Sequence, residues 1–283
     1  MPLNCRTDLA SEAHALLPRG VGGQRGIRAR EETLFSHRVT AVEILNEEGA
    51  ELIGKPAGRY FTLFLDGRFE RGAERFDDAA RAVAELIRRC MRKGRASSCL
   101  IAALGNPDIT PDALGSLAAG SIIVTRHLKR AALDGFDGFA STALCRTGVL
   151  GTTGVESASQ VRALAEEIQP ELIIAIDALA GSELGGLCRT VQICDSGIAP
   201  GSGVGNDREE LSRASLGVPV IAVGVPTVTD AAALAPGEEL RGMFVTPRDI
   251  DSLVRAAGRL IGYGVDLALH PGLSVADVDM LVG

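Results

Sequence analysis

The sequence predicts an α/β fold in which a mostly parallel or mixed sheet is covered by helices on both faces. Short continuous apolar runs recur along the chain, such as CLIAALG at 99–105 and ELIIAI at 171–176. Stretches with apolar residues at helical spacing separate these runs. Strands that are apolar on both faces are typical of sheets buried between helical layers, so the alternation of the two patterns favours this fold class.

The expected elements follow in order along the chain. An alternating strand is expected over 37–45 and its partner over 59–65, and a helix over 76–93 is ended by Gly94. Buried strands are expected over 99–105, 139–144, 171–176, 189–194 and 219–225, with helices over 112–127, 157–168 and 247–270. We expect a single α/β domain over 1–283, in which 1–36 is a polar N-terminal arm and 37–65 is a small strand pair.

The composition argues against several classes of protein. The 29 basic and 36 acidic side chains give a net charge of −7, and Trp is absent, so we expect no direct binding of nucleic acid. No apolar run approaches the roughly 18 residues that span a membrane, and MPLNCRTDLASEA has no apolar signal-peptide core. We therefore expect no membrane partner. No spacing in the sequence demands a metal or another cofactor, and we expect none.

Four aspartates lie at or just after predicted strand ends: Asp108, Asp112, Asp177 and Asp195. Ligands of open α/β sheets bind outside the carboxyl ends of the strands, so we expect these acids along one edge of the sheet. Two carboxylates that converge share a proton, because close negative charges destabilise each other. One can then activate a water while the other protonates a leaving group. Taken singly, Asp112 and Asp177 are better explained as caps of the segments that follow them, whereas a cluster favours a site.

Other patterns have simpler interpretations. Asp195-Ser196-Gly197 matches the D-S-G of pepsin-like proteases, but those folds are all-β, so we interpret it as turn chemistry beside a site that Asp195 can still line. GSGVGN at 201–206 lacks the spacing of a dinucleotide loop and is interpreted as a shaped loop. We interpret His127 and His270 as structural, and a metal site formed by aspartates, Glu156 and His127 stays open as an alternative.

A series of longer blocks runs in order over nearly the whole chain. They are RTDLA (6–10), GNPDITPDALG (105–115), TRHL (125–128), GTTGVES (151–157), AIDALA (175–180), QICDSGIAPGSGVGN (192–206), LGVPVIAVGVPTVTDA (216–231), FVTP (244–247) and ALHP (268–271). With these blocks the chain resembles the germination protease family of spore-forming Firmicutes.

The resemblance implies an endopeptidase that cleaves small acid-soluble spore proteins, in the cytoplasm of the spore core, when a spore germinates. It also implies a fold similar to that of hydrogenase-maturation proteases, a homotetramer, and synthesis as an inactive zymogen. The implied partners are the spore proteins as substrates and further copies of the chain.

The two catalytic aspartates of the family match Asp112 in the TPDALG block and Asp177 in the IDALA block. These are positions that the strand-end argument selects independently. The implied mechanism is direct attack by water: one ionised carboxylate accepts the water proton, and the other, protonated, polarises the scissile carbonyl. Which aspartate does which stays open, because a coupled pair titrates as a unit. Four further residues are expected to bind substrate or to support the pair: Asn106, Glu156, Asp195 and Gly203.

Three departures from the family pattern bear on function. The stretch GSELGG at 181–186 has no arginine where the family usually carries them, so a weaker hold on acidic substrate residues is expected. The segment between the PTVTDA block and FVTP is short. Only MPLNC precedes RTDLA, which argues against control by removal of an N-terminal propeptide.

Two alternatives accompany this interpretation. One is a metal-linked maturation-type peptidase or amidase on the same fold. The other is a non-catalytic, sporulation-associated binding protein.

The first block raises a separate question. Thr7-Asp8-Leu9-Ala10-Ser11-Glu12 matches in kind the substrate motif of the family, Thr-Glu-(Phe or Ile)-Ala-Ser-Glu-Phe. The segment is therefore either a plain surface arm or a mimic of substrate that enters its own or a neighbour's cleft.

Overall fold

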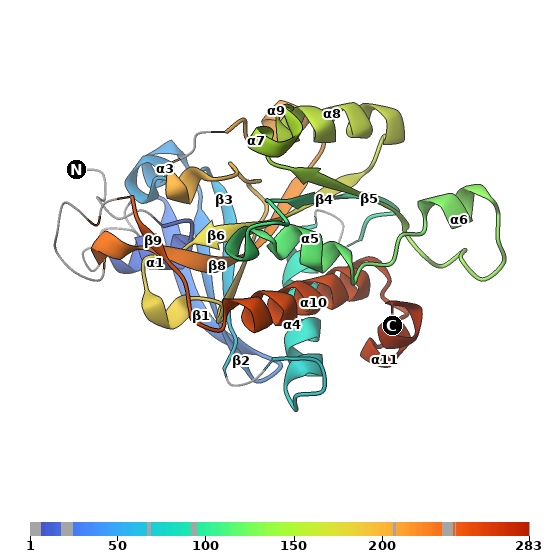
Figure 1. Ribbon diagram of the computed structural model, residues 1–283, viewed down its shortest axis with the longest axis horizontal. Helices are drawn as coiled ribbons and strands as arrows, with labels where there is room; N and C mark the ends of the chain where they lie inside the picture. Colours follow the sequence, from blue (N-terminus) through green and yellow to red (C-terminus); the bar gives the residue numbers. More distant parts are fainter. Residues whose placement is uncertain are drawn as a thin grey trace.

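A mixed sheet forms the centre of the computed structural model (Figure 1). The structure describes residues 7–17, 25–66, 69–91, 95–205, 208–233, 240 and 242–282. Within these residues the sheet has nine strands in the order β1-β2-β3-β7-β8-β6-β4-β5, and β9 pairs with β8 outside this path. The strands are β1 (Ile27–Leu34), β2 (His37–Ile44), β3 (Gly58–Phe64), β4 (Ser98–Leu104), β5 (Ser141–Gly148), β6 (Leu172–Ala180), β7 (Thr190–Cys194), β8 (Val220–Asp230) and β9 (Phe244–Val245).

The helices fall between and after these strands. They are α1 (Ala10–Ala15), α3 (Glu47–Ile53), α4 (Phe76–Cys90), α5 (Leu114–Ala119), α6 (Arg126–Arg130), α7 (Leu150–Thr153), α8 (Ser157–Ile168), α9 (Arg213–Leu216), α10 (Ile250–Leu269) and α11 (Val275–Val282). Single 3-10 turns are η1 (Thr110–Asp112), η2 (Leu184–Gly186), η3 (Ser202–Val204) and η4 (Ala231–Ala233). No helix in the described part of the chain is long and apolar enough to cross a membrane.

The sheet has two halves that differ in strand direction. β5, β4, β6 and β8 run parallel to one another. From β8 outward, β7, β3, β2 and β1 each pair antiparallel. The predicted α/β fold with a mixed sheet is thus confirmed. The direction of β7 matters for the site, because its carboxyl end lies at the opposite edge from those of β4 and β6.

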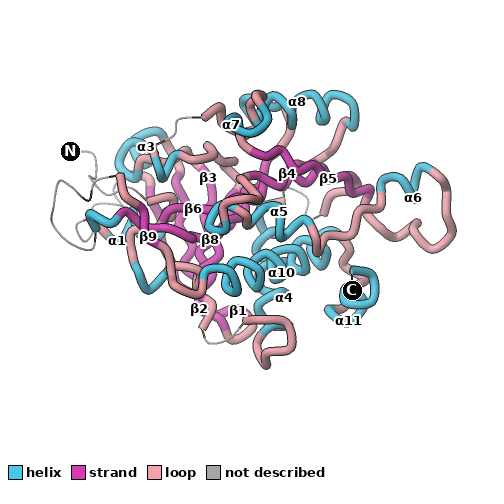
Figure 2. Tube along the Cα trace, in the orientation of Figure 1, coloured by secondary structure: helices cyan, strands magenta, loops and turns pink. Residues whose placement is uncertain are grey.

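Helices cover both faces of the sheet (Figure 2). On one face α4, α5 and α10 pack on alternate residues of the central strands, including Ile101, Ile174 and Val223, and form the largest core cluster of the described residues. On the other face α8 packs on β4 and β6, while α1 and α3 pack on β2 and β3. Because β4 and β6 are buried on both faces, nearly every residue in them is apolar.

Several expected boundaries differ from the observed ones. The helix expected over 112–127 is wrong as one element: η1, α5 and α6 form instead, and a non-helical run at 121–125 separates α5 from α6. That run includes the β-branched Ile122 and Ile123, which favour extended backbone, and the Ile123 N–H donates to Asp266 Oδ1 in α10 at 3.0 Å. The expected arm over 1–36 contains the edge strand β1, whose mixed charges hid it because most of its side chains face solvent.

Two strands run further than expected. β6 continues through Asp177 to Ala180, and β8 continues through Pro226 to Asp230. Pro226 is tolerated because it lies where the β6–β8 register shifts, between Leu179 and Ala180. Asp177 therefore lies inside a buried strand and not in the loop after it.

Candidate active site

A cavity of about 640 Å³ lies at the carboxyl ends of the parallel strands β4, β5 and β6. Its walls come from the end of β4 with the loop after it, from the end of β5, and from the last residues of β6. Four of the residues selected from the sequence line it: Asn106, Asp112, Glu156 and Asp177. The cavity lies outside the carboxyl ends of parallel strands, where ligands of open α/β sheets bind.

Asp112 ends the 3-10 turn η1 just after β4. Its Oδ2 accepts a hydrogen bond from the Asn106 N–H at 2.8 Å, so the side chain turns back toward β4 and caps no following helix. Gly105, at φ +92°, makes this possible: a Cβ there would lie 2.1 Å from the Asp112 carbonyl oxygen. Burial raises the pKa of Asp112, and the Asn106 N–H opposes that shift by stabilising the ionised form.

Asp177 is only 4% exposed and lies between β4 and β8 in the sheet. Its Oδ1 accepts one hydrogen bond, from its neighbour Ala178 N–H at 3.0 Å. No ion pair of Asp177 is found within the described residues. Burial raises the pKa of Asp177 well above its usual value, and the charges of Asp112 and Asp8 raise it further. Burial raises the pKa of both carboxyls, and it does so more for Asp177, so Asp177 is the one of the two that is favoured to hold a proton.

Glu156 and Arg208 form an ion pair on the wall of the same cavity. Arg208 Nη1 lies 3.4 Å from Glu156 Oε1, and both side chains are about one-third exposed. Glu156 is the residue before α8, yet its side chain makes no capping bond to that helix. Its charge is therefore directed toward the cavity wall and Arg208.

Asp195 does not share the edge expected for it. Because β7 is antiparallel to β8, the residue after β7 lies at the opposite edge of the sheet, and Asp195 is not among the residues that line the cavity. Its Oδ1 accepts the Arg59 main-chain N–H and its Oδ2 accepts Arg59 Nε, both at 2.7 Å. Asp195 thus attaches the loop after β7 to β3.

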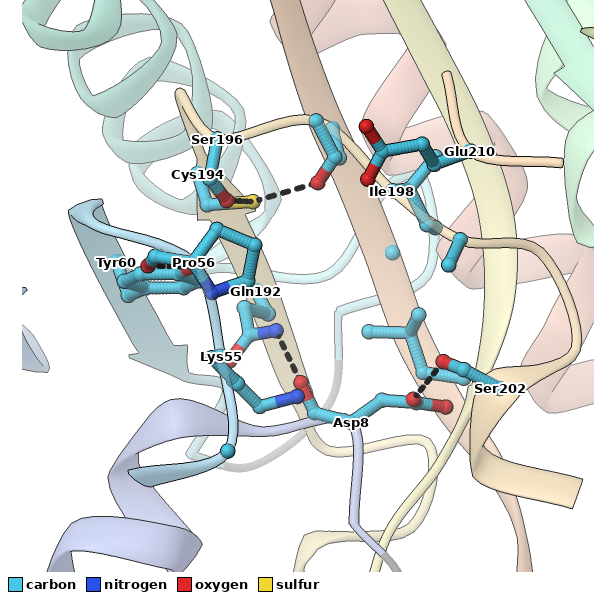
Figure 3. A pocket seen from close by; sticks show the side chains of 16 residues that line it. Asp8, Lys55, Pro56, Tyr60, Gln192, Cys194, Ser196, Ile198, Ser202 and Glu210 are labelled. Atoms are coloured by element: carbon cyan, nitrogen blue, oxygen red, sulfur yellow. Dashed lines mark hydrogen bonds between the residues drawn. The ribbon is translucent and has the colours of Figure 1, made fainter. Parts of the chain in front are cut away.

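Gly203 lies beside a residue that the sequence did not select for the site, Asp8. A Cβ on Gly203 would come within 2.2 Å of Asp8 Oδ2, so only glycine lets the carboxylate approach. That Oδ2 accepts the Ala180 N–H at 2.8 Å, and Oδ1 accepts Ser202 Oγ at 2.9 Å (Figure 3). Asp8 also lines the cavity of Asp112 and Asp177. The N-terminal segment therefore brings a third carboxylate into this cavity.

The residues around Asp8 dock over the sheet and do not extend into solvent. Leu9 and Ala10 are 1% and 0% exposed. Glu12 is also buried, and its Oε2 accepts Ser182 N–H and Ser182 Oγ, both at 2.7 Å. Ser182 belongs to the stretch 181–186 that lacks arginines, so this stretch binds an acidic side chain through a main-chain N–H and a hydroxyl.

A second, smaller cavity of about 190 Å³ adjoins Asp8. Figure 3 shows Lys55 pointing toward Asp8 and Gln192 bonded to it. Burial lowers the pKa of Lys55, and the charge of Asp8 opposes that shift. Sequence reasoning missed Lys55, Gln192 and Arg208, since nothing local distinguishes them. The signal for Asp8 was present in Thr7–Glu12, as the likeness to a substrate motif.

Histidine and metal chemistry were weighed at the sequence level. His270 is buried, its Nδ1 accepts the Ala140 N–H at 3.2 Å, and burial lowers its pKa to about 4. His127 lies on α6 and does not line the cavity. The described residues contain no cluster of three or more His, Cys, Asp or Glu side chains that could hold a metal ion.

Comparison with known proteins shows which family the sequence matches. A family model described as germination protease matches residues 19–240. The germination protease of Caldanaerobacter subterraneus subsp. tengcongensis is 37% identical, over 99% of this chain and 98% of that protein. The germination protease of Clostridium perfringens is 34% identical over 98% of each chain, and that of Oceanobacillus iheyensis is 38% identical over 83% of this chain and 66% of that protein.

Among solved structures, the chain is similar to the [NiFe] hydrogenase maturation protease HycI from Thermococcus kodakarensis KOD1. The sequences are 17% identical, the TM-score is 0.34, and the match covers 64% of this chain and 98% of that chain.

Proposed function

Because this chain belongs to the germination protease family, and is thus a peptidase, we propose that it is an aspartic-type endopeptidase whose substrates are small acid-soluble spore proteins. The observation that carries the proposal is that Asp112 and Asp177 line one cavity in unequal environments. Paired carboxylates with different proton affinities can supply the base and the acid of one hydrolysis.

In the proposed reaction, Asp112 is the base. It is more exposed than Asp177, and the Asn106 N–H stabilises its ionised form. It takes a proton from a water as the water oxygen attacks the carbonyl carbon of the scissile peptide bond.

Asp177 is the acid. Its buried carboxyl holds a proton, donates a hydrogen bond to the carbonyl oxygen as negative charge develops there, and then protonates the leaving amine as the C–N bond breaks. At the end of the cycle Asp112 holds the proton taken from water and Asp177 is ionised. Proton exchange with solvent restores the starting state.

The test is cleavage of a peptide that carries the family's substrate motif, with the cut located by mass spectrometry. Asp112→Asn and Asp177→Asn are each expected to lower kcat at least about 1,000-fold. Each substitution removes one of the two proton-transfer groups, and the reaction needs both. Asp108→Asn is the matched control: Asp108 lies in the same loop, is exposed and does not line the cavity. Full activity of either pair variant would contradict the assignment.

The same assay separates the two alternatives. Activity that EDTA abolishes and a divalent ion restores would favour a metal-linked peptidase or amidase. Tight binding of the peptide without cleavage, with both aspartates intact, would favour a binding protein.

The location in the spore core, a homotetrameric assembly and a zymogen form belong to the proposal as well. Light scattering on the purified protein tests the assembly. N-terminal sequencing before and after incubation tests for a zymogen, and the segment Thr7–Glu12, whose Asp8 lines the cavity, is the first place to look for a cut.

A further inference from the structure

Gln192 has a side-chain amide whose donor and acceptor are both bonded to main-chain groups of the N-terminal segment. It lies on the central strand β7 and is 6% exposed. Its Nε2 donates to the Asp8 carbonyl oxygen at 2.6 Å, and its Oε1 accepts the Ala10 N–H at 2.7 Å. One amide side chain therefore grips the two peptide groups on either side of Leu9.

These bonds do not depend on the side chains of the segment that is held. Any peptide in the same path offers a carbonyl and an N–H at the same two places. The end of β6 adds a third main-chain contact, from Asp8 N–H to the Ala180 carbonyl oxygen at 2.9 Å. Three main-chain groups of the segment are thus bonded, at Asp8 and at Ala10, the first residue of α1, and such bonds fix the register of a bound chain whatever its side chains are.

Burial makes these two hydrogen bonds of Gln192 important. A glutamine amide buried in a sheet needs partners for its donor and its acceptor, since an unpaired buried polar group costs free energy. Within the described residues the hydrogen bonds of the Gln192 side chain go to Asp8 and Ala10 alone. The chain's own residues 8 and 10 satisfy the amide in this structure, and a peptide that replaced them in the same path would satisfy it in the same way.

The path leads into the proposed active site. Asp8 lines both the cavity of Asp112 and Asp177 and the smaller cavity that Gln192 lines (Figure 3). A peptide gripped at the positions of Asp8 and Ala10 is therefore presented at the wall of the cavity that contains the two aspartates.

We propose that Gln192 is a positioning residue of the peptidase: a main-chain clamp that holds peptide substrates on the path of residues 8–10, bonded through the carbonyl of one residue and the N–H of the second residue after it. This inference rests on the proposed function, because it takes the ligand to be a peptide substrate. Gln192 sets the register of the peptide, and contacts such as those of Ser202 with Asp8 and Ser182 with Glu12 read its side chains.

The experiment pairs a change in the protein with a change in the peptide backbone. The full-length protein and its Gln192→Met variant, which keeps the side-chain length without a hydrogen-bonding amide, are each given three versions of a labelled peptide with the sequence of residues 6–15. One is the parent peptide. One has an ester oxygen in place of the N–H at the alanine equivalent to Ala10. The control carries the ester at the following serine, which Gln192 does not contact.

Both Kd, from fluorescence anisotropy, and kcat/KM are measured, and the ratio of parent to ester is compared within each protein. The protein's own N-terminal segment competes equally with all three peptides, so it cancels from the ratio. In the wild-type chain the ester at the Ala10 position is expected to weaken binding and kcat/KM about tenfold, the effect of one buried hydrogen bond. In Gln192→Met the same ester is expected to change them less than about twofold, because the acceptor is already gone.

A second variant guards against a general effect of the substitution. Gln169→Met changes an exposed glutamine at the end of α8 and is expected to keep the wild-type ratio. An equal ester effect in the wild type and in Gln192→Met overturns the clamp. So does a wild-type chain that binds neither the parent peptide nor the Ala10-position ester, or that binds these two equally. If the wild type binds with the expected ratio and cleaves nothing, the clamp stands and the proposed peptidase mechanism fails.

Discussion

Two aspartates beside the central strands, Asp177 and Asp195, have opposite environments. Asp177 lies inside β6, is 4% exposed, and has one main-chain donor and two acidic neighbours. Asp195 follows β7, and Arg59 supplies it with a main-chain N–H and a guanidinium N–H, both at 2.7 Å. Arg59 places a positive charge beside Asp195, whereas burial and two acidic neighbours raise the pKa of Asp177.

The environment of each carboxyl, and not its local sequence motif, separates what Asp177 does from what Asp195 does. Asp195 carries the D-S-G pattern that looks like a protease signature, yet it serves to fix a loop to β3. Asp177 stands in an apolar run that looks like an ordinary buried strand. Strand direction produces the contrast: the parallel β6 brings Asp177 to the cavity, and the antiparallel β7 takes Asp195 to the other edge.

The largest expected effect is on activity. Asp177→Asn is expected to lower kcat for a motif peptide at least about 1,000-fold, while Asp195→Asn lowers it less than about tenfold, because only the first removes a proton donor. Initial rates from a fluorogenic peptide measure both. Comparable losses in the two variants would remove the distinction drawn between them.

A smaller loss of activity is expected when the Asp112 carboxylate is displaced but not replaced. In Gly105→Ala the new Cβ would meet the Asp112 carbonyl oxygen, and φ +92° is strained for alanine. Displacing the carboxylate by about 1 Å is expected to lower kcat about 100-fold. Gly72→Ala is the control, since φ is +94° there too and a Cβ meets nothing within 4 Å. Equal activity of the two variants would show that the position of Asp112 is not critical.

The next effect is on stability and concerns Asp195. Asp195→Ala is expected to lower the free energy of unfolding by about 1–2 kcal/mol, because Arg59 loses its partner in a partly exposed pair. Urea unfolding followed by circular dichroism measures the change. An unchanged midpoint would mean that the loop after β7 is held by other contacts.

The last expected effect is a difference in the pH dependence of stability. Because the folded-state pKa of Asp177 lies above 3.8, the folded state binds its proton more tightly, and stability falls as the pH rises from about 3.8 toward the raised pKa. Asp177→Asn lacks this fall, which is at most about 1.4 kcal/mol per pH unit. The variant should therefore match the wild type in acid and exceed it near neutral pH, in urea unfolding repeated from pH 4 to 8. A stability difference that does not change with pH would contradict the raised pKa.

Much of the fold could be predicted from the sequence, for identifiable reasons. β4 and β6 are continuous apolar runs, and α8 and α10 have clear helical spacing with polar residues at their starts, so their positions follow from periodicity. The interrupted helix after Asp112 could not be predicted, because the contact of Ile123 with Asp266 joins segments far apart in the sequence.

The site divides in the same way. Asp112 and Asp177 were found because strand ends of a parallel sheet converge, and the family blocks select them as well. Asp195 was expected at the same edge because the apolar run 189–194 does not show whether its strand runs parallel or antiparallel to the others. Gln192 and Lys55 lie beside Asp8, which is far from both of them in the sequence, so no local pattern reveals the contact.

The most direct test of the unequal environments is the protonation of the carboxyls themselves. Protein labelled with ¹³C at the aspartate side-chain carboxyl can be titrated by NMR, with the Asp177 signal assigned from its absence in the spectrum of Asp177→Asn. The raised pKa of Asp177 predicts that its signal titrates well above pH 3.8, the ordinary aspartate value. An Asp177 signal that titrates near pH 4, like an ordinary exposed aspartate, would contradict it.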